Sequence, residues 1–123
     1  MFHLLLVEDN PRFRQTLAET LHDRFPAIRI LQVDSGEQAL ARAADSALDF
    51  IIMDIHLGAK SGLQATQELK KSHPDLEIAL LSNHDLPEYR QAALSSGACC
   101  LISKNDDYAT RISSLLAERL PTH

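Results

Sequence analysis

Residues 50–54 read FIIMD, a short apolar run that ends in a carboxylate. The run is continuously apolar rather than apolar at every second position, which is typical of a strand covered on both faces. Similar runs lie at residues 4–7, 28–33, 78–81 and 99–102. Between the runs, apolar residues recur at helical spacing. Five strands that alternate with helices predict an α/β domain with a parallel sheet and helices on both of its faces.

Two of the expected helices begin with a capping-box pattern. Ser35 stands three residues before Gln38, and Ser61 stands three residues before Gln64. In this pattern the serine hydroxyl accepts a hydrogen bond from the third amide of the helix, and the glutamine side chain accepts one from the amide of the serine. The pattern therefore predicts helices that start at residues 36 and 62.

A fourth helix is expected after the run at residues 78–81. We expect Asp85 to cap it and Pro87 to lie in its first turn, where a missing amide hydrogen costs nothing. Leu86, Ala93 and Leu94 are expected to face inward, and Gly97 is expected to end the helix.

Composition excludes several classes of protein. The chain has 123 residues, of which 45% are hydrophobic and 24% charged, so one domain can bury a core without metal or disulfide support. The net charge of −5 argues against a surface for duplex DNA or anionic membranes. No apolar run approaches the roughly 20 residues that span a bilayer. The first run is too short for a signal peptide and ends in Glu8 and Asp9, so a cytoplasmic location is expected.

The two cysteines, Cys99 and Cys100, are adjacent. Neighbouring residues do not reach normal disulfide geometry without strain. On a strand their side chains would point to opposite faces. We expect them to be small apolar fillers, with a redox pair as the alternative.

Chemically active side chains follow four of the five strand runs. Glu8 and Asp9 follow the first run, Asp54 the third, Ser82 the fourth and Lys104 the fifth. Because the strands are parallel, these ends share one edge of the sheet. Two carboxylates about 4 Å apart repel by roughly 4 kcal/mol at an effective dielectric of 20, and a divalent cation such as Mg²⁺ would relieve this. A carboxylate nucleophile, a divalent cation, a lysine and a hydroxyl together predict a site for phosphoryl transfer.

These residues also carry a family resemblance that covers essentially the whole chain. The sequence resembles the receiver domain of bacterial two-component response regulators. The matching pieces, in order along the chain, are Glu8-Asp9, Met53-Asp54 with Leu57 and Gly62, Leu81-Ser82, and Lys104 shortly after Gly97-Ala98. The resemblance implies a flavodoxin-like (βα)5 three-layer sandwich with a five-stranded parallel sheet in the order 2-1-3-4-5.

The resemblance also implies a role for each site residue. Asp54 would be the phosphoacceptor. Asp9, Asp54 and the backbone carbonyl of His56 would hold Mg²⁺, and Glu8 would support the ion through water. Lys104 and Ser82 would contact the phosphoryl oxygens. Such a domain is a phosphoacceptor that assists its own phosphorylation and dephosphorylation, rather than an enzyme with an external substrate.

The implied partners and domain limits follow from the same resemblance. A sensor histidine kinase, or a small acyl phosphate, would donate the phosphoryl group. The Ser82-Asn83-His84 run, and the lack of proline after Lys104, look closest to the LuxR-type class, in which a helix-turn-helix domain follows the receiver.

We expect a receiver over residues 1–120 and the start of a linker or tail at 121–123. DNA would be contacted only through an output domain absent from this chain. A homodimer through the fourth helix, fifth strand and fifth helix is expected, and no membrane contact.

The chain departs from the family pattern near the site. Leu101 stands where the family usually has Tyr or Phe, so it is either a smaller switch residue or simple packing. Asn83 replaces the usual small residue beside Ser82 and is expected to narrow the entry to Asp54. Gly58 replaces a common proline and frees the loop after residue 54.

Other interpretations stay open on sequence grounds. His56 and His84 either tune the attack of water on the phosphoaspartate or are ordinary exposed loop histidines. With Asp54 they could also form a zinc site, although their spacing is not diagnostic. The chain could instead be a pseudo-receiver, an interaction module that works without phosphorylation, or a small metal-dependent phosphatase in which His56 or His84 is the general acid.

Overall fold

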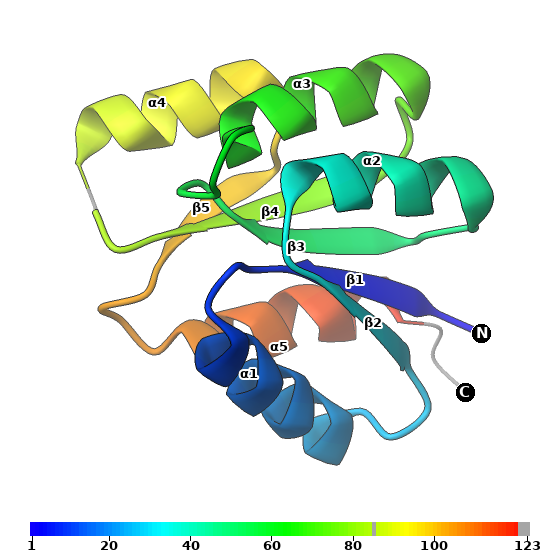
Figure 1. Cartoon of the computed structure of the whole chain (residues 1–123). Helices are drawn as coiled ribbons and strands as arrows, with labels where there is room; N and C mark the ends of the chain where they lie inside the picture. Colours follow the sequence, from blue (N-terminus) through cyan, green and yellow to red (C-terminus); the bar gives the residue numbers. More distant parts are fainter. Residues whose placement is uncertain (85, 121–123) are drawn as a thin grey trace.

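Strands and helices alternate along the chain in the computed structural model, which describes residues 1–84 and 86–120 (Figure 1). The strands are β1 His3–Val7, β2 Arg29–Val33, β3 Phe50–Asp54, β4 Glu77–Ser82 and β5 Cys100–Ser103. The helices are α1 Pro11–Arg24, α2 Gly36–Asp45, α3 Gly62–Ser72, α4 Pro87–Ser96 and α5 Tyr108–Arg119. All strand pairs are parallel, and the order is β2-β1-β3-β4-β5. The predicted fold class and strand order are confirmed. The expected linker start at 121–123 lies outside the described residues.

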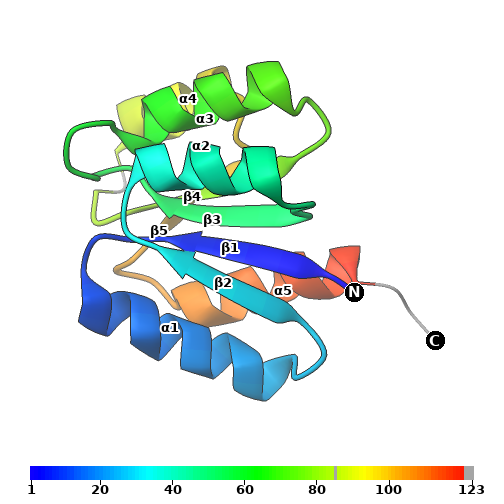
Figure 2. The same ribbon diagram turned by 45° about the vertical axis from the view of Figure 1, so that its right-hand side comes forward.

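The sheet is the middle of three layers. Helices α2, α3 and α4 cover one face, and α1 and α5 cover the other (Figures 1 and 2). Every residue of β3 is buried. Ile51 and Met53 point into the core under α2, α3 and α4, whereas Phe50 and Ile52 point into the core under α1 and α5. This double burial explains the continuously apolar run, because each such side chain contributes about 1.5–3 kcal/mol on leaving water.

Side-chain caps mark the starts of α1, α2 and α3. The full capping box forms at Ser61 and Gln64, as predicted. At α2 only half of it forms. The Ser35 hydroxyl accepts from the Gln38 amide, but the Gln38 side chain accepts from the amide of Asp34 instead of Ser35. The side chain of Asn10 caps α1 by accepting from two backbone amides, and this brings the chain out of β1 directly into the helix.

Helix α4 differs from the sequence expectation on its surface. Leu86, at the N-cap position, and Leu94 were expected to face inward, but both are exposed, with Leu94 at 55%. The buried face is narrow and consists of Ala93 and Ser96. Gly97 ends the helix as predicted, at a φ of 108°, which favours glycine. The expected cap Asp85 lies outside the described residues.

The strand order determines where a ligand would bind at the sheet edge. From the adjacent strands β1 and β3 the chain leaves toward opposite faces of the sheet, into α1 and α3. The carboxyl ends of these two strands therefore bound a crevice, which is where ligands bind in open parallel sheets.

Candidate functional site

Three carboxylates meet at the carboxyl ends of β1 and β3. Potential ligand oxygens of Glu8, Asp9 and Asp54 all lie within 4.8 Å of one another. Glu8 and Asp54 are buried, whereas Asp9 is exposed. Carboxylate oxygens are the donors that Mg²⁺ takes in proteins, and an exposed third carboxylate leaves room for water and phosphate. The chemistry of this donor set therefore fits a hard divalent cation.

Lys104 reaches this cluster from the loop after β5. Its Nζ donates to Glu8 Oε1 at 2.5 Å and to Asp54 Oδ2 at 2.6 Å. The side chain is largely buried between its two partners. Its backbone is fixed as well, since the Lys104 amide donates to the Ser82 carbonyl at 2.8 Å. The structure thus brings together four residues from the carboxyl ends of three strands, β1, β3 and β5.

Burial and charge perturb the titration of this cluster. Burial raises the pKa of Glu8 to about 7 and outweighs the opposing hydrogen bond from Lys104, while the Asp54 charge raises it further. Burial would by itself lower the pKa of Lys104, but the hydrogen bonds to Asp54 and Glu8 outweigh it and raise that pKa. Lys104 therefore stays charged at neutral pH.

The backbone around Asp54 holds its carboxylate in place. The His56 amide donates to Asp54 Oδ1 at 2.9 Å, so the two carboxylate oxygens have different partners. Gly62, at the start of α3, lies against the Asp54 backbone. A Cβ at Gly62 would collide with the Asp54 carbonyl oxygen and lie 2.9 Å from the Ile55 Cα. Gly62 is one of the residues that carry the family resemblance. Its close approach to Asp54 depends on the packing of α3 and could not be predicted from the sequence.

Ser82 ends β4 beside the cluster and is fully buried. Its Oγ accepts from the His84 amide at 3.0 Å. Asn83 is exposed, and its carbonyl accepts from the Asn105 side chain at 2.7 Å. This bond ties the loop after β4 to the loop after β5. Asn105 was not among the expected site residues, because nothing in its local sequence predicts a bond across 22 residues.

His56 and His84 lie together with Tyr89 of α4. The ring centroids of His56 and His84 are 5.4 Å apart, and the His84 ring stacks on Tyr89 at 5.5 Å. Within residues 1–84 and 86–120, the potential metal-binding group is the carboxylate trio, and neither histidine joins it. Both histidines are exposed, and with Tyr89 they form a small aromatic cluster beside the site.

Leu101 is only 3% exposed and belongs to the core under α2, α3 and α4. It pairs in register with Leu80 of β4, two residues before Ser82. The side chain is fully committed to packing in this structure. Its expected part in switching stays a prediction.

Phe13 is a further site residue, which the sequence indicated only as part of a helix stripe. The Lys104 Nζ lies 4.3 Å from the centroid of its ring, and the ring stacks on Tyr108 of α5 at 5.2 Å. A cation over an aromatic face is held electrostatically by the ring quadrupole. Residues from α1 and α5 thus help to hold the lysine.

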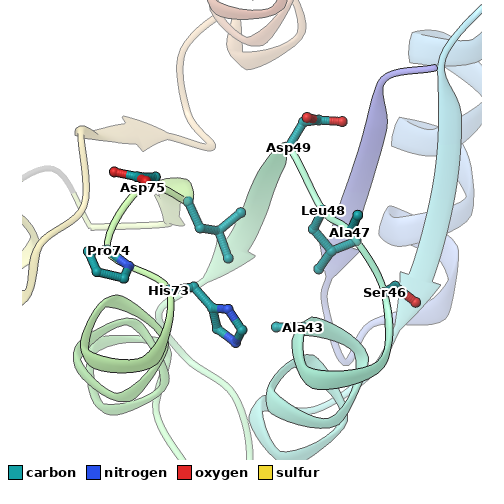
Figure 3. A pocket seen from close by; sticks show the side chains of 9 residues that line it. Ala43, Ser46, Ala47, Leu48, Asp49, His73, Pro74 and Asp75 are labelled. Atoms are coloured by element: carbon teal, nitrogen blue, oxygen red, sulfur yellow. The ribbon is translucent and has the colours of Figure 1, made fainter.

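A hollow of about 410 Å³ lies away from this cluster, at the amino ends of β3 and β4 (Figure 3). It is lined by Ala43 and the loops at residues 46–49 and 73–76. His73 points into it, but Asp49 and Asp75 lie apart at its rim in the close-up (Figure 3). The hollow therefore lacks the clustered carboxylates and lysine of the crevice.

No helix within residues 1–84 and 86–120 has the length and hydropathy to cross a membrane.

Comparisons with known proteins agree with this geometry. The family model described as Response regulator receiver domain matches residues 4–114. The chain is 34% identical over 101 residues to the transcriptional activator protein ExaE of Pseudomonas putida, covering 82% of this chain and 47% of that protein. It is 27% identical over 115 residues to the response regulator GacA of Pseudomonas viridiflava, covering 94% of this chain and 54% of that protein. The chain thus spans about half the length of the curated relatives it matches.

A solved structure shares the fold over nearly the whole chain. The response regulator protein TrrA of Thermotoga maritima, in complex with Mg²⁺ and BeF, superposes with a TM-score of 0.85 at 26% identity, covering 98% of this chain and 100% of that one. The family match covers most of the described residues and includes every member of the carboxylate–lysine cluster. The chain therefore belongs to the response regulator receiver domains of two-component systems.

Proposed function

We propose that this receiver domain is a switch phosphorylated on Asp54 in a Mg²⁺-dependent reaction. The observation that supports this most directly is the position of Asp54. Its carboxylate is buried beside two further carboxylates, and its Oδ2 lies 2.6 Å from Lys104 Nζ. A buried carboxylate between a cation-binding oxygen cluster and a lysine is suited to attack phosphorus while its surroundings neutralise the added charge.

The proposed reaction is an in-line transfer. An Asp54 carboxylate oxygen forms a bond to phosphorus, and the bond from phosphorus to a kinase histidine nitrogen breaks. The imidazole leaves with the electron pair of that bond and is protonated by solvent. Mg²⁺, held by Asp9, Asp54 and the His56 carbonyl with Glu8 acting through water, would offset the phosphoryl charge when bound. Water later hydrolyses the acyl phosphate and restores Asp54.

Lys104 and Ser82 have separate proposed roles. Lys104 is charged and already hydrogen-bonded to Asp54, so a short movement of Nζ would bring it to a phosphoryl oxygen. The Ser82 hydroxyl accepts from the His84 amide and retains its own hydrogen for donation to the phosphoryl group. His56, His84 and Asn83 are exposed in the loops after β3 and β4 and are proposed to tune the access of water.

The proposed partners follow from the family. A sensor histidine kinase would donate the phosphoryl group, and a longer protein would carry a transcriptional output domain, as the name of ExaE suggests for that relative. We propose a cytoplasmic location, no enzymatic activity on external substrates, and dimerisation through α4, β5 and α5. Exposed Leu94 supports an α4 contact.

Mass spectrometry tests the phosphoacceptor. Incubation with Mg²⁺ and acetyl phosphate is expected to add one phosphoryl group to the wild type and none to Asp54→Asn. Asp34→Asn is the matched control, because Asp34 also follows a strand but is outside the carboxylate cluster. This control should be phosphorylated like the wild type, and chelation of Mg²⁺ should abolish the adduct.

Three results would contradict the proposal. A phosphoryl group that persists in Asp54→Asn would place the acceptor elsewhere. A wild type that stays unmodified with both acetyl phosphate and a phosphorylated kinase would favour the pseudo-receiver. Turnover of external phosphoesters would instead favour the phosphatase alternative.

A further inference from the structure

The adjacent cysteines form a thiol pair at the edge of the sheet. Cys99 is exposed, Cys100 is half-buried, and their sulfurs lie 3.6 Å apart. The expectation that they point to opposite faces is wrong, because Cys99 lies in a bend before β5 rather than in the strand. The expectation of apolar fillers is also wrong for Cys99, which is exposed. Cys100 packs partly against the core under α1 and α5.

Cys100 borders a pocket between β5 and α5. The pocket has a volume of about 280 Å³ and is lined by Cys100, Ile102, Thr110, Arg111, Ser114 and Leu115. Its lining combines a thiol, a guanidinium and two hydroxyls with an apolar floor. Such a lining suits a small ligand that carries carboxylates, since a guanidinium group binds carboxylates through paired hydrogen bonds.

The charges around the two sulfurs differ. The positive charges of Arg111, Arg119 and Arg90 all favour a thiolate on Cys100. At Cys99 the charge of Arg119 is opposed by the negative charge of Glu77. Arg119 is itself paired with Glu77, through bonds of 2.8 and 2.7 Å. The thiolate is therefore better stabilised on Cys100.

Titration of the pair agrees with this asymmetry. The hydrogen bond from Cys99, followed by the nearby arginines, lowers the pKa of Cys100 to about 7 against the effect of burial. The same bond and burial raise the pKa of Cys99. A half-exposed thiol with a lowered pKa, close to arginine, has the surroundings of reactive cysteines.

The adjacency of the two cysteines disfavours a disulfide between them. Consecutive Cα atoms lie about 3.8 Å apart, below the roughly 4.4–6.8 Å that unstrained disulfides span. Attack of the Cys99 thiol on a mixed disulfide at Cys100, which would release the adduct, is therefore unfavourable. An adduct on Cys100 is expected to persist.

We propose that Cys100 is a modification site that forms a mixed disulfide with small anionic disulfides, of which oxidised glutathione is the probe. The Cys100 thiolate attacks one sulfur of the reagent, the reagent's S–S bond breaks, and a new S–S bond joins Cys100 to one glutathionyl group. The other glutathionyl sulfur leaves with the electron pair and takes up a proton from solvent. The disulfide reagent is the oxidant, and Cys100 is oxidised. Cys99 supplies the hydrogen bond that favours the thiolate, and Arg111 attracts the carboxylates.

This site is separate from the proposed phosphorylation site and does not depend on it. Cys100 pairs in register with Ala79, whereas Ser103 pairs with Ser82 at the opposite end of β5. At about 3.3 Å per residue, Cys100 is roughly 10 Å along the strand from Ser103. The modified surface lies between β5 and α5, where the proposed dimer contact lies.

The test is intact-mass and peptide mapping of the chain after incubation with oxidised glutathione at pH 7. The wild type is expected to gain one glutathionyl group on Cys100, Cys99→Ser is expected to retain the reaction, and Cys100→Ser is expected to lose it. Arg111→Gln should slow the reaction by about fivefold, as expected for the loss of one nearby charge. Arg111 is exposed, so this variant should fold normally.

The control reagent is cystamine, a disulfide that carries two ammonium groups in place of the carboxylates of oxidised glutathione. Arg111→Gln should react with cystamine at least as fast as the wild type does. Equal slowing with both reagents would overturn the role of Arg111. An adduct on Cys99, a loss of two hydrogens without an adduct, or no reaction of the folded wild type would overturn the proposal.

Discussion

The ammonium group of Lys104 lies 4.3 Å from the centroid of the Phe13 ring. The same group donates to Glu8 and Asp54, so it is held by two carboxylates and by an aromatic face. Phe13 comes from α1 and Lys104 from the loop after β5, at opposite ends of the chain. The contact connects the helix that follows β1 to the lysine that pairs with Glu8 and Asp54.

A double-mutant cycle measures this contact. Phe13→Leu and Lys104→Met, singly and together, are expected to show a coupling of about 0.5–2 kcal/mol in the free energy of unfolding, because a partly desolvated cation–π contact is lost. Urea unfolding provides the values. Tyr108→Phe preserves the ring beside Phe13 and should leave the coupling unchanged. A coupling below about 0.3 kcal/mol would mean that the two side chains are energetically independent.

The raised pKa of Glu8 predicts a pH dependence of stability in the metal-free protein. The folded state holds the Glu8 proton up to a pKa of about 7, against an ordinary pKa of 4.5, so it binds more protons than the unfolded chain between these values. Stability is then fully present below about pH 4.5 and is lost as the pH rises through 7, by about 3 kcal/mol. Unfolding with urea at pH 5 and pH 8, in chelator, measures the change. Glu8→Gln should remove this part of the slope, and an unchanged slope in that variant would assign it to other groups.

Gly58, in the loop after β3, and Gly62, the first residue of α3, offer a matched pair of alanine variants. Gly62→Ala would place a Cβ against the Asp54 carbonyl and is expected to destabilise the fold by about 2–3 kcal/mol. At Gly58 an added Cβ would meet no heavy atom within 4 Å, and the φ of this residue is not positive. Gly58→Ala is therefore expected to stabilise by about 0.4–1 kcal/mol through the unfolded state. Thermal unfolding compares the two, and similar effects would show that the loop absorbs the clash.

Restoring the family aromatic at position 101 is expected to be unfavourable. Leu101 is buried in a packed core, so Leu101→Tyr should cost about 1–3 kcal/mol through overpacking. Leu94→Tyr, on the exposed surface of α4, is the control and should stay within about 0.5 kcal/mol of the wild type. Denaturant unfolding of both variants measures the difference. A neutral Leu101→Tyr would show that space for a mobile aromatic exists at this position.

Much of the candidate site could be predicted because parallel strands place their carboxyl ends together. Glu8, Asp9, Asp54 and Lys104 each follow an apolar run, and no further information is needed to bring them to one edge. The bonds among them could not be predicted in the same way. That Lys104 bridges Glu8 and Asp54, and that Phe13 lies over it, depends on how α1 and the loop after β5 pack.

The incorrect expectations share a physical cause. Leu94 has the spacing of a buried residue, but α4 packs through its small residues and leaves that position exposed. Cys99 has the sequence neighbours of a strand residue, but a bend brings its sulfur to that of Cys100. Periodicity describes a single element, whereas exposure depends on which neighbour covers it.

Local patterns along this chain specify the alternation of strands and helices, the double burial of the sheet and the polar residues at its edge, because each depends on short stretches of backbone and on their hydropathy. Long-range packing selects the partners of Lys104, the tight approach of Gly62 to Asp54 and the burial of Leu101 in the core. Those features join residues far apart in the chain or depend on how closely two backbone segments approach. Neither the long-range contacts nor the close approach can be read from any single segment.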